Sequence, residues 1–178
     1  KTCGHPTMNL HTPLFLLACT SLSLMARAQE HAHAPHQHAA PPGAALVASP
    51  LAVPLDAATL ATFPRQAVTA SAHGQVLQCE GIPLSALLRA AKALPEEPLR
   101  GPGLANYVLV TARDGYRAVF SLAELEPTLG NQQVLLVDRC AGQPLPEKDG
   151  PLRLIAPEES RPARWVRQVQ SITVVAAP

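Results

Sequence analysis

Three arginines and one tryptophan cluster near the C-terminal end of the chain, at Arg153, Arg164, Trp165 and Arg167. A guanidinium group is planar and always charged, and its N–H donors match a phosphate or carboxylate in bidentate contacts. These residue types therefore predict a binding site for an anionic small molecule. The alternative interpretation is a solvated charged face, in which the arginines pair with Glu158 and Glu159.

A turn and two short strands are predicted around this cluster. The residues Lys148–Pro151 are typical of a turn. The apolar run Leu152–Ala156 then predicts a strand, and the β-branched residues from about Ser171 onward predict the final strand. Arg153 lies inside the first of these strands. An unpaired guanidinium is costly there, and a bound phosphate or a nearby carboxylate would compensate for it.

Upstream of this region, the sequence predicts short strands and one or two helices. Asp114 and Gly115 separate two strand-like runs and predict a hairpin. The leucines of Leu84–Leu94 fall on one face of a helix, and Ser121 with Glu124 has the spacing of a capping box. Aromatic residues make up only 3% of the chain, so the core must be built from aliphatic side chains. We expect an α+β fold with a mainly β core.

Several motifs in a fixed order resemble the sulfite-oxidase-type molybdopterin-binding domain family. They are GIPLSALL at 81–88, GQPLP at 142–146, GPLRL at 150–154 and ARWVR at 163–167. The resemblance covers about residues 67–174. It implies the mainly β fold of that family, with one or two short helices, and a molybdopterin-type cofactor. By the same resemblance, the cofactor's phosphate and pterin would be held by Arg153, Arg164, Trp165 and Arg167.

The chain departs from the family pattern at positions that matter for catalysis. Family enzymes ligate molybdenum with a cysteine well upstream of the G-x-P-L helix, whereas the nearby candidate here is Cys79, two residues before Gly81. Asp149 or Gly150 stands where such enzymes often carry a histidine, which removes a donor and places a negative charge near the phosphate site. We also expect the protein to lack the substrate-binding segment and the dimerisation domain of sulfite oxidases.

Because function depends on the residues of the site and not on the fold, these departures mean that the resemblance supports the family's fold more strongly than its catalytic activity. We expect an exported accessory or degenerate member of the family, which binds molybdopterin or another anionic ligand weakly or not at all. The alternative is an active molybdopterin-dependent oxidoreductase, with Cys79 as an unusual metal ligand and a redox partner protein.

Cys79 and Cys140 are the two cysteines that remain after the expected signal peptide. An even number of cysteines in an oxidising compartment is typical of a disulfide, and a pair of buried thiols is the other interpretation. A bond that closes this loop of about 60 residues would add about 4 kcal/mol of stability in the chain-entropy model.

The first 28 residues are expected to be removed from the mature protein. They comprise an extension before Met8, an apolar stretch, and a small-x-small pattern at 26–28 that predicts signal-peptide cleavage before Gln29. A lipoprotein signal with a lipidated Cys19 is the alternative. The apolar stretch is shorter than the roughly 20 residues of a membrane span. We therefore expect a periplasmic or secreted protein with no transmembrane helix in the mature chain.

Residues 29–50 form a polar arm before the domain, which we expect to span residues 51–178. The arm cannot bury enough apolar surface to fold, so we expect it to be disordered. It carries four histidines within eight residues, namely His31, His33, His36 and His38. Neutral imidazole binds zinc, copper and nickel. Periplasmic metal binding by this arm is a further functional hypothesis, beside the interpretation of a solvated linker. The formal net charge of +1 gives no signal for nucleic-acid binding.

Overall fold

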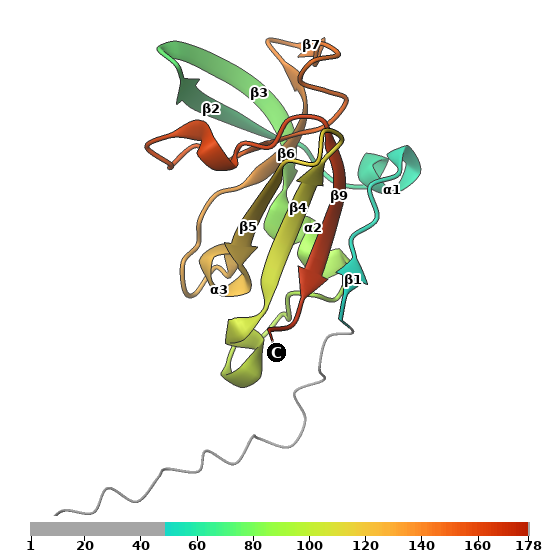
Figure 1. Ribbon diagram of the computed structural model, residues 1–178, viewed down its shortest axis with the longest axis vertical. Coiled ribbons are helices and arrows are strands. Elements are labelled where there is room, and N and C mark those ends of the chain that lie inside the picture. The colour runs from blue at the N-terminus through green and yellow to red at the C-terminus, as the bar shows by residue number, and fades with distance from the viewer. Residues whose placement is uncertain (1–48, 178) are drawn as a thin grey trace, which may run out of the picture. The chain divides into compact units, whose positions relative to one another are not determined.

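The computed structural model describes residues 49–177, which form two antiparallel sheets and three short helices (Figure 1). The strand order in the first sheet is β1 (Leu51–Ala52), β9 (Val169–Val175), β4 (Tyr107–Ala112) and β5 (Arg117–Ser121). The order in the second is β2 (Gln66–Ala72), β3 (Gln75–Pro83), β6 (Leu135–Cys140) and β7 (Gln143–Pro144), while β8 (Arg153–Ile155) also pairs with β6. The helices are α1 (Ala57–Ala61), α2 (Leu84–Ala90) and α3 (Leu122–Leu125), and the 3-10 turns are η1 (Gly101–Ala105) and η2 (Pro162–Arg164).

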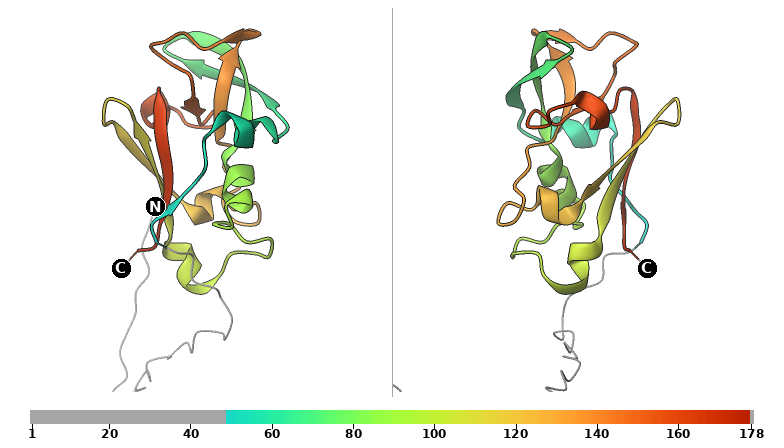
Figure 2. Two further views of the ribbon diagram at one scale, coloured as in Figure 1. Left: turned by 90° about the vertical axis from the view of Figure 1, so that its right-hand side faces the viewer. Right: turned by 60° about the vertical axis from the view of Figure 1, so that its left-hand side comes forward.

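This arrangement confirms the predicted α+β class with a mainly β core. The helix α2 lies behind the first sheet in Figure 1 and beside it in the left view of Figure 2. Alternate residues of the sheet point inward, as the period of a strand requires, and they belong to the same hydrophobic core as the leucines of α2. The buried residues of these elements are Val108, Val110, Ala112, Ala118, Phe120, Val169, Ile172 and Val174 from the strands and Leu84, Leu87 and Leu88 from the helix. Within residues 49–177, no helix is long and apolar enough to cross a membrane.

The strand β6 is the central strand of the second sheet. It pairs with β3 on one edge and with β7 and β8 on the other, so its residues Leu135–Val137 are all buried. A bulge between Glu80 and Gly81 lets β3 approach this strand closely. A Cβ atom at position 81 would lie 2.6 Å from the Cα atom of Val137, which explains why the position is a glycine.

The hairpin around Gly115 and the capping box form where they were predicted. β2 and β3 meet at His73 and Gly74, and β4 and β5 meet around Gly115. At the start of α3, the Glu124 backbone N–H donates to Ser121 Oγ at 3.1 Å, and the Ser121 backbone N–H donates to Glu124 Oε2 at 2.6 Å. These elements depend on residues close in sequence, and their positions follow from local turn chemistry.

Two predicted boundaries were wrong. The helix expected over Leu84–Leu94 ends at Ala90, because Lys92 adopts a left-handed φ of 59° and the Leu94 N–H turns back to the Leu88 carbonyl. The final strand starts at Val169 rather than at about Ser171, because its pairing with β4 continues past one extra residue in β9 and places Val169 opposite Ala112.

The segment between β1 and β2 contains the helix α1. Asp56 precedes it in an extended conformation, and its Oδ1 accepts a hydrogen bond of 2.9 Å from the Thr59 N–H. This is the geometry of an N-cap, which supports one short helix in a stretch otherwise bounded by prolines.

Candidate anion-binding site

Two segments distant in sequence lie side by side and form the site. The Val169 N–H donates to the Leu152 carbonyl at 2.9 Å, and the Leu154 N–H donates to the Val166 carbonyl at 2.7 Å. These bonds hold the chain after η2 against β8 and the turn before it. The predicted site residues Arg153 and Arg167 are therefore brought together.

Asp149 lies between these two arginines. Its Oδ1 atom is 3.6 Å from a terminal nitrogen of Arg153 and 3.6 Å from Nε of Arg167. Both distances are longer than a direct hydrogen bond, so the carboxylate balances charge without occupying the arginine donors. The side chains of Arg153 and Asp149 are 13% and 15% exposed, whereas that of Arg167 is 57% exposed. The site thus has one arginine that is mostly buried and one that is open to solvent.

The guanidinium of Arg153 is incompletely compensated. Its Nε atom is buried and has no hydrogen-bond partner among residues 49–177. Burial lowers the pKa of Arg153 below its ordinary value, since desolvation outweighs the opposing effect of Asp149, and the positive charge of Arg167 lowers it further. The arrangement therefore leaves a buried donor and a surplus of positive charge on this side of the domain.

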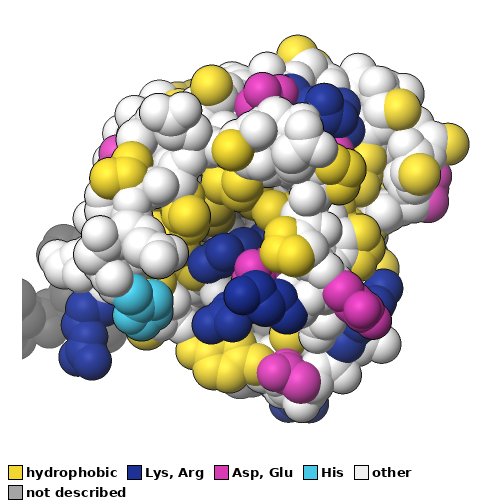
Figure 3. Space-filling view, turned by 90° about the horizontal axis from the view of Figure 1, so that it is seen from above, with side chains coloured by type: hydrophobic (Ala, Val, Ile, Leu, Met, Phe, Trp, Pro, Cys, Tyr) yellow, Lys and Arg dark blue, Asp and Glu magenta, His cyan; other side chains and the backbone are white. Residues whose placement is uncertain are grey.

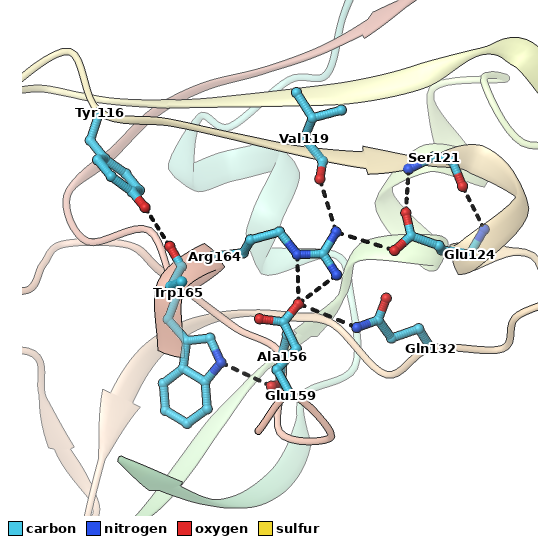
Figure 4. A network of polar contacts seen from close by, with 10 residues as sticks. Tyr116, Val119, Ser121, Glu124, Gln132, Ala156, Glu159, Arg164 and Trp165 are labelled. Carbon is cyan, nitrogen blue, oxygen red and sulfur yellow. Dashed lines mark hydrogen bonds and ion pairs between the residues drawn. The ribbon is translucent and has the colours of Figure 1, made fainter. Parts of the chain in front are cut away.

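Trp165 forms part of the support for Arg153. Its ring is buried, and the centroid lies 5.9 Å from Arg153 Cζ, within the range of a cation–π contact. Its indole N–H donates to the Ala156 carbonyl at 2.9 Å, which fixes the ring (Figure 4). The tryptophan thus orients the arginine and has its own polar atom already satisfied.

The end of the molecule that carries the β2–β3 hairpin, β7 and η2 is shown in Figure 3. Lys or Arg side chains lie near the middle of this face with an acidic side chain among them, next to a hollow lined by hydrophobic side chains. A surface of this kind suits a ligand with an anionic group attached to a flat or apolar body.

Arg164, the third arginine predicted to hold the cofactor, points into a different network (Figure 4). Its Nε donates to Glu159 at 2.7 Å, while one terminal nitrogen contacts the Val119 carbonyl at 3.0 Å and Glu124 at 3.1 Å. Its Cζ also lies 4.2 Å from the centroid of the Phe120 ring. Arg164 therefore ties η2 to β5 and α3 with most of its donors engaged.

Replacing Arg164 with glutamine should lower the free energy of unfolding by about 2 kcal/mol. Hydrogen bonds to charged groups contribute about 1.5–3 kcal/mol each, and a discount applies because a third of the side chain is exposed. Lysine should not restore the stability, since a single ammonium cannot reach two carboxylates and a carbonyl in this geometry. Urea denaturation is the measurement, with Arg161→Gln as the matched control. A loss no larger than that of the control would contradict a structural role.

The two cysteines in the described residues are bonded to each other. Cys79 and Cys140 face each other directly in the register of β3 and β6, and the structure joins them in a disulfide. Cys79 is 2% exposed. The sulfur of Cys79 is therefore bonded to that of Cys140, and a disulfide sulfur is not a thiolate that could bind a metal. No group of three or more His, Cys, Asp or Glu residues that could hold a metal ion occurs within residues 49–177.

The remaining predicted sites fall outside the described residues. They are the signal-peptide positions, including Cys19 and the cleavage point before Gln29, and the candidate metal ligands His31, His33, His36 and His38. His73, within the described part, is exposed at the tip of the β2–β3 hairpin.

Sequence reasoning missed Glu124 as a partner of Arg164. Glu159 is one of the two glutamates that the sequence offers as partners for the arginines, and it pairs with Arg164 at 2.6 Å. Glu124 lies 40 residues before Arg164, and its capping-box spacing had already explained its presence. No local signal links these two residues, so only the folded chain shows their contact.

Comparison with known families agrees with the fold and with these motifs. The family described as "Oxidoreductase molybdopterin binding domain" matches residues 47–178. The chain therefore belongs to the oxidoreductase molybdopterin-binding domain family, which confirms the resemblance seen in its motifs. No curated protein matches the chain at a significant level.

Proposed function

We propose that this chain is an exported accessory member of the family, which binds the anionic part of a pterin-type or other small ligand through Arg153 and Arg167. One observation carries the proposal. The buried Nε of Arg153 has no partner among the described residues, beside a second arginine. A buried donor left without an acceptor is costly, and a phosphate oxygen would satisfy it.

The residues of the site suit the phosphate of a molybdopterin cofactor, but the described cysteines do not suit its metal. Arg153 and Arg167 suit its phosphate, because a guanidinium binds phosphate oxygens in pairs. When loaded with molybdenum, the cofactor would supply a redox centre. The described cysteines supply no thiolate to such a metal, since Cys79 is bonded to Cys140. The proposal is therefore limited to ligand binding.

Export is supported by the same disulfide. Disulfides form and persist in oxidising compartments such as the periplasm, and they are rare in a reducing cytosol. The bond between Cys79 and Cys140 thus agrees with the signal peptide expected from the first 28 residues.

An active molybdopterin-dependent oxidoreductase with a redox partner protein is the alternative function. It would require Cys79 to leave the disulfide and bind the metal. Molybdenum content separates the two proposals, measured on protein purified from a periplasm competent in cofactor synthesis. We expect far less than one molybdenum atom per chain, with equal values for wild type, Cys79→Ala and Cys140→Ala.

The Cys140→Ala variant is the stringent control, because it frees the thiol of Cys79. Stoichiometric metal in the wild type that disappears in Cys79→Ala would contradict our preference. So would a gain of stoichiometric metal in Cys140→Ala.

A further inference from the structure

The strand β2 is the outermost strand of the second sheet, and its outer edge differs from the other sheet edges of the described domain (Figure 1). An uncovered edge exposes a row of backbone N–H and C=O groups that can pair with another strand. Proteins protect such edges with short strands, prolines, charged side chains or a covering segment.

The other edge strands of the described domain are short or covered. β1 and β7 are each two residues long, and prolines lie within or beside both. On β5, the Arg164 side chain donates to the Val119 carbonyl at 3.0 Å. On β8, the Leu154 N–H donates to the Val166 carbonyl at 2.7 Å, so another segment lies along this strand. These edges therefore offer little backbone to a further strand.

β2 has none of these protections over Gln66–Ala72. It contains no proline and no charged residue, and it pairs with β3 without a bulge. The turn between the two strands has a positive φ at His73 (51°) and at Gly74 (75°), as in a type I′ hairpin. In such a hairpin, Ala72 and Gln75 exchange two hydrogen bonds, and every second pair of residues along the strands does the same.

This alternation directs the backbone groups of Ala67, Thr69 and Ser71 to the outer edge of β2. Within residues 49–177, no other strand pairs with this edge, and none of these groups bonds to a turn or loop. The side chains of the three residues are exposed, whereas those of Val68 and Ala70 are buried. The edge is therefore a regular, uncharged row of donors and acceptors.

We propose that the β2 edge binds a second copy of this chain, in an antiparallel pair centred on Thr69. If Thr69 lies opposite Thr69 of the second copy, Ala67 lies opposite Ser71, and the outward N–H and C=O groups of both copies join in about six hydrogen bonds. The two threonine side chains then meet on the exposed face, which is a favourable cross-strand pair. No like charges meet along the strand, because it carries none. The edge is thus complementary to itself.

This pairing ends at a dimer. A two-fold pair uses the β2 edge of both copies, and the other edges of the described domain are protected, so a third copy finds no long edge to extend. Arg65, which precedes β2, is paired with Asp138 at 2.6 Å, so its charge is balanced where it approaches the second copy. One pair of strands makes a small interface, and we therefore expect a weak dimer in the micromolar-to-millimolar range.

An exchange of charges at position 69 tests the pairing, by sedimentation velocity of the purified full chain over a series of concentrations. Wild type should shift from monomer to dimer as the concentration rises. Thr69→Lys and Thr69→Glu should each weaken the dimer by about tenfold, because like charges then stand opposite each other at the two-fold centre. An equimolar mixture of these two variants should dimerise more tightly than either variant alone.

The matched control is Gln78→Lys, because Gln78 is exposed and lies directly beside Thr69 on β3. In the dimer, this lysine and its counterpart would be three strand spacings apart, about 14 Å, which exceeds the screening length of about 8 Å. Dimerisation should therefore be unchanged. Thr69→Pro provides a second variant, since an edge strand tolerates a proline whose missing N–H faces outward. It should keep the thermal midpoint of the Gln78→Lys control and weaken the dimer by about tenfold.

Amide hydrogen exchange, followed by NMR, checks the register. The amides of Thr69 and Ser71 should exchange more slowly as the concentration rises, whereas those of Val68 and Ala70 should be protected at every concentration. A monomer at all concentrations would overturn the inference, and so would a dimer that Thr69→Lys leaves intact. Protection of the Thr69 amide in the dilute monomer overturns it as well, because another part of the same chain would then cover the edge.

Discussion

Removal of the disulfide, by Cys79→Ala together with Cys140→Ala, should lower the free energy of unfolding by about 4 kcal/mol. The bond closes a loop with a sequence separation of 61 residues, which contains β4, β5, α2 and α3. In the chain-entropy model, the loss comes from the larger freedom of the unfolded chain. Since a domain of this size is stable by only about 5–15 kcal/mol, a large part of its stability depends on this bond.

Urea denaturation followed by circular dichroism measures this effect. The control is wild-type protein treated with a reductant, which should match the double variant, because both lack the bond. A double variant as stable as the oxidised wild type would contradict the account. Two free thiols per chain, titrated in denaturant after purification from the periplasm, would contradict it as well.

The pairing of these cysteines could not be predicted from the sequence alone. The sequence shows an even count and predicts strands near both residues, and it leaves a disulfide and two thiols equally open. The choice depends on the register of β3 and β6, which places Cys79 opposite Cys140. That register follows from the bulge at Glu80 and Gly81 and from the packing of β6, which are properties of the whole sheet.

Local elements were predicted well because their causes are local. The Gly115 turn, the Ser121 cap and the apolar strand around Arg153 each depend on a few consecutive residues. The first part of α2 follows from its leucine spacing, but its end depends on Lys92, whose left-handed conformation is not expected for a lysine. The separate elements predicted only an α+β class, whereas the family motifs predicted the fold of a particular family.

The roles of the three arginines required the folded chain. In sequence, Arg153, Arg164 and Arg167 look alike, and all three were predicted to bind a cofactor. Arg164 binds Glu159, Glu124 and a backbone carbonyl, whereas the buried Nε of Arg153 has no hydrogen-bond partner in the described part of the chain. Two of the partners of Arg164 lie 40 and 45 residues away, and no local pattern could indicate them.

Replacing Arg153 with alanine should weaken binding of a phosphate-bearing pterin by about tenfold to a hundredfold. This range corresponds to the loss of charge-assisted hydrogen bonds, each worth about 1.5–3 kcal/mol, with a tenfold change in affinity for each 1.4 kcal/mol. Arg167→Ala should weaken binding less, because its side chain is 57% exposed and solvent screens its charge. Arg161→Ala is the matched control, since Arg161 is exposed and forms no ion pair within the described domain.

The most direct test of the central claim, that Arg153 is the core of an anion site, is a thermal-shift titration of the wild type and these three variants with a phosphate-bearing pterin. Each shift is compared with the ligand-free midpoint of the same variant, so differences in intrinsic stability do not enter. The account predicts a concentration-dependent rise for wild type and Arg161→Ala, a smaller rise for Arg167→Ala, and the smallest for Arg153→Ala. No shift in the wild type up to millimolar ligand, or an equal shift in Arg153→Ala, would contradict it.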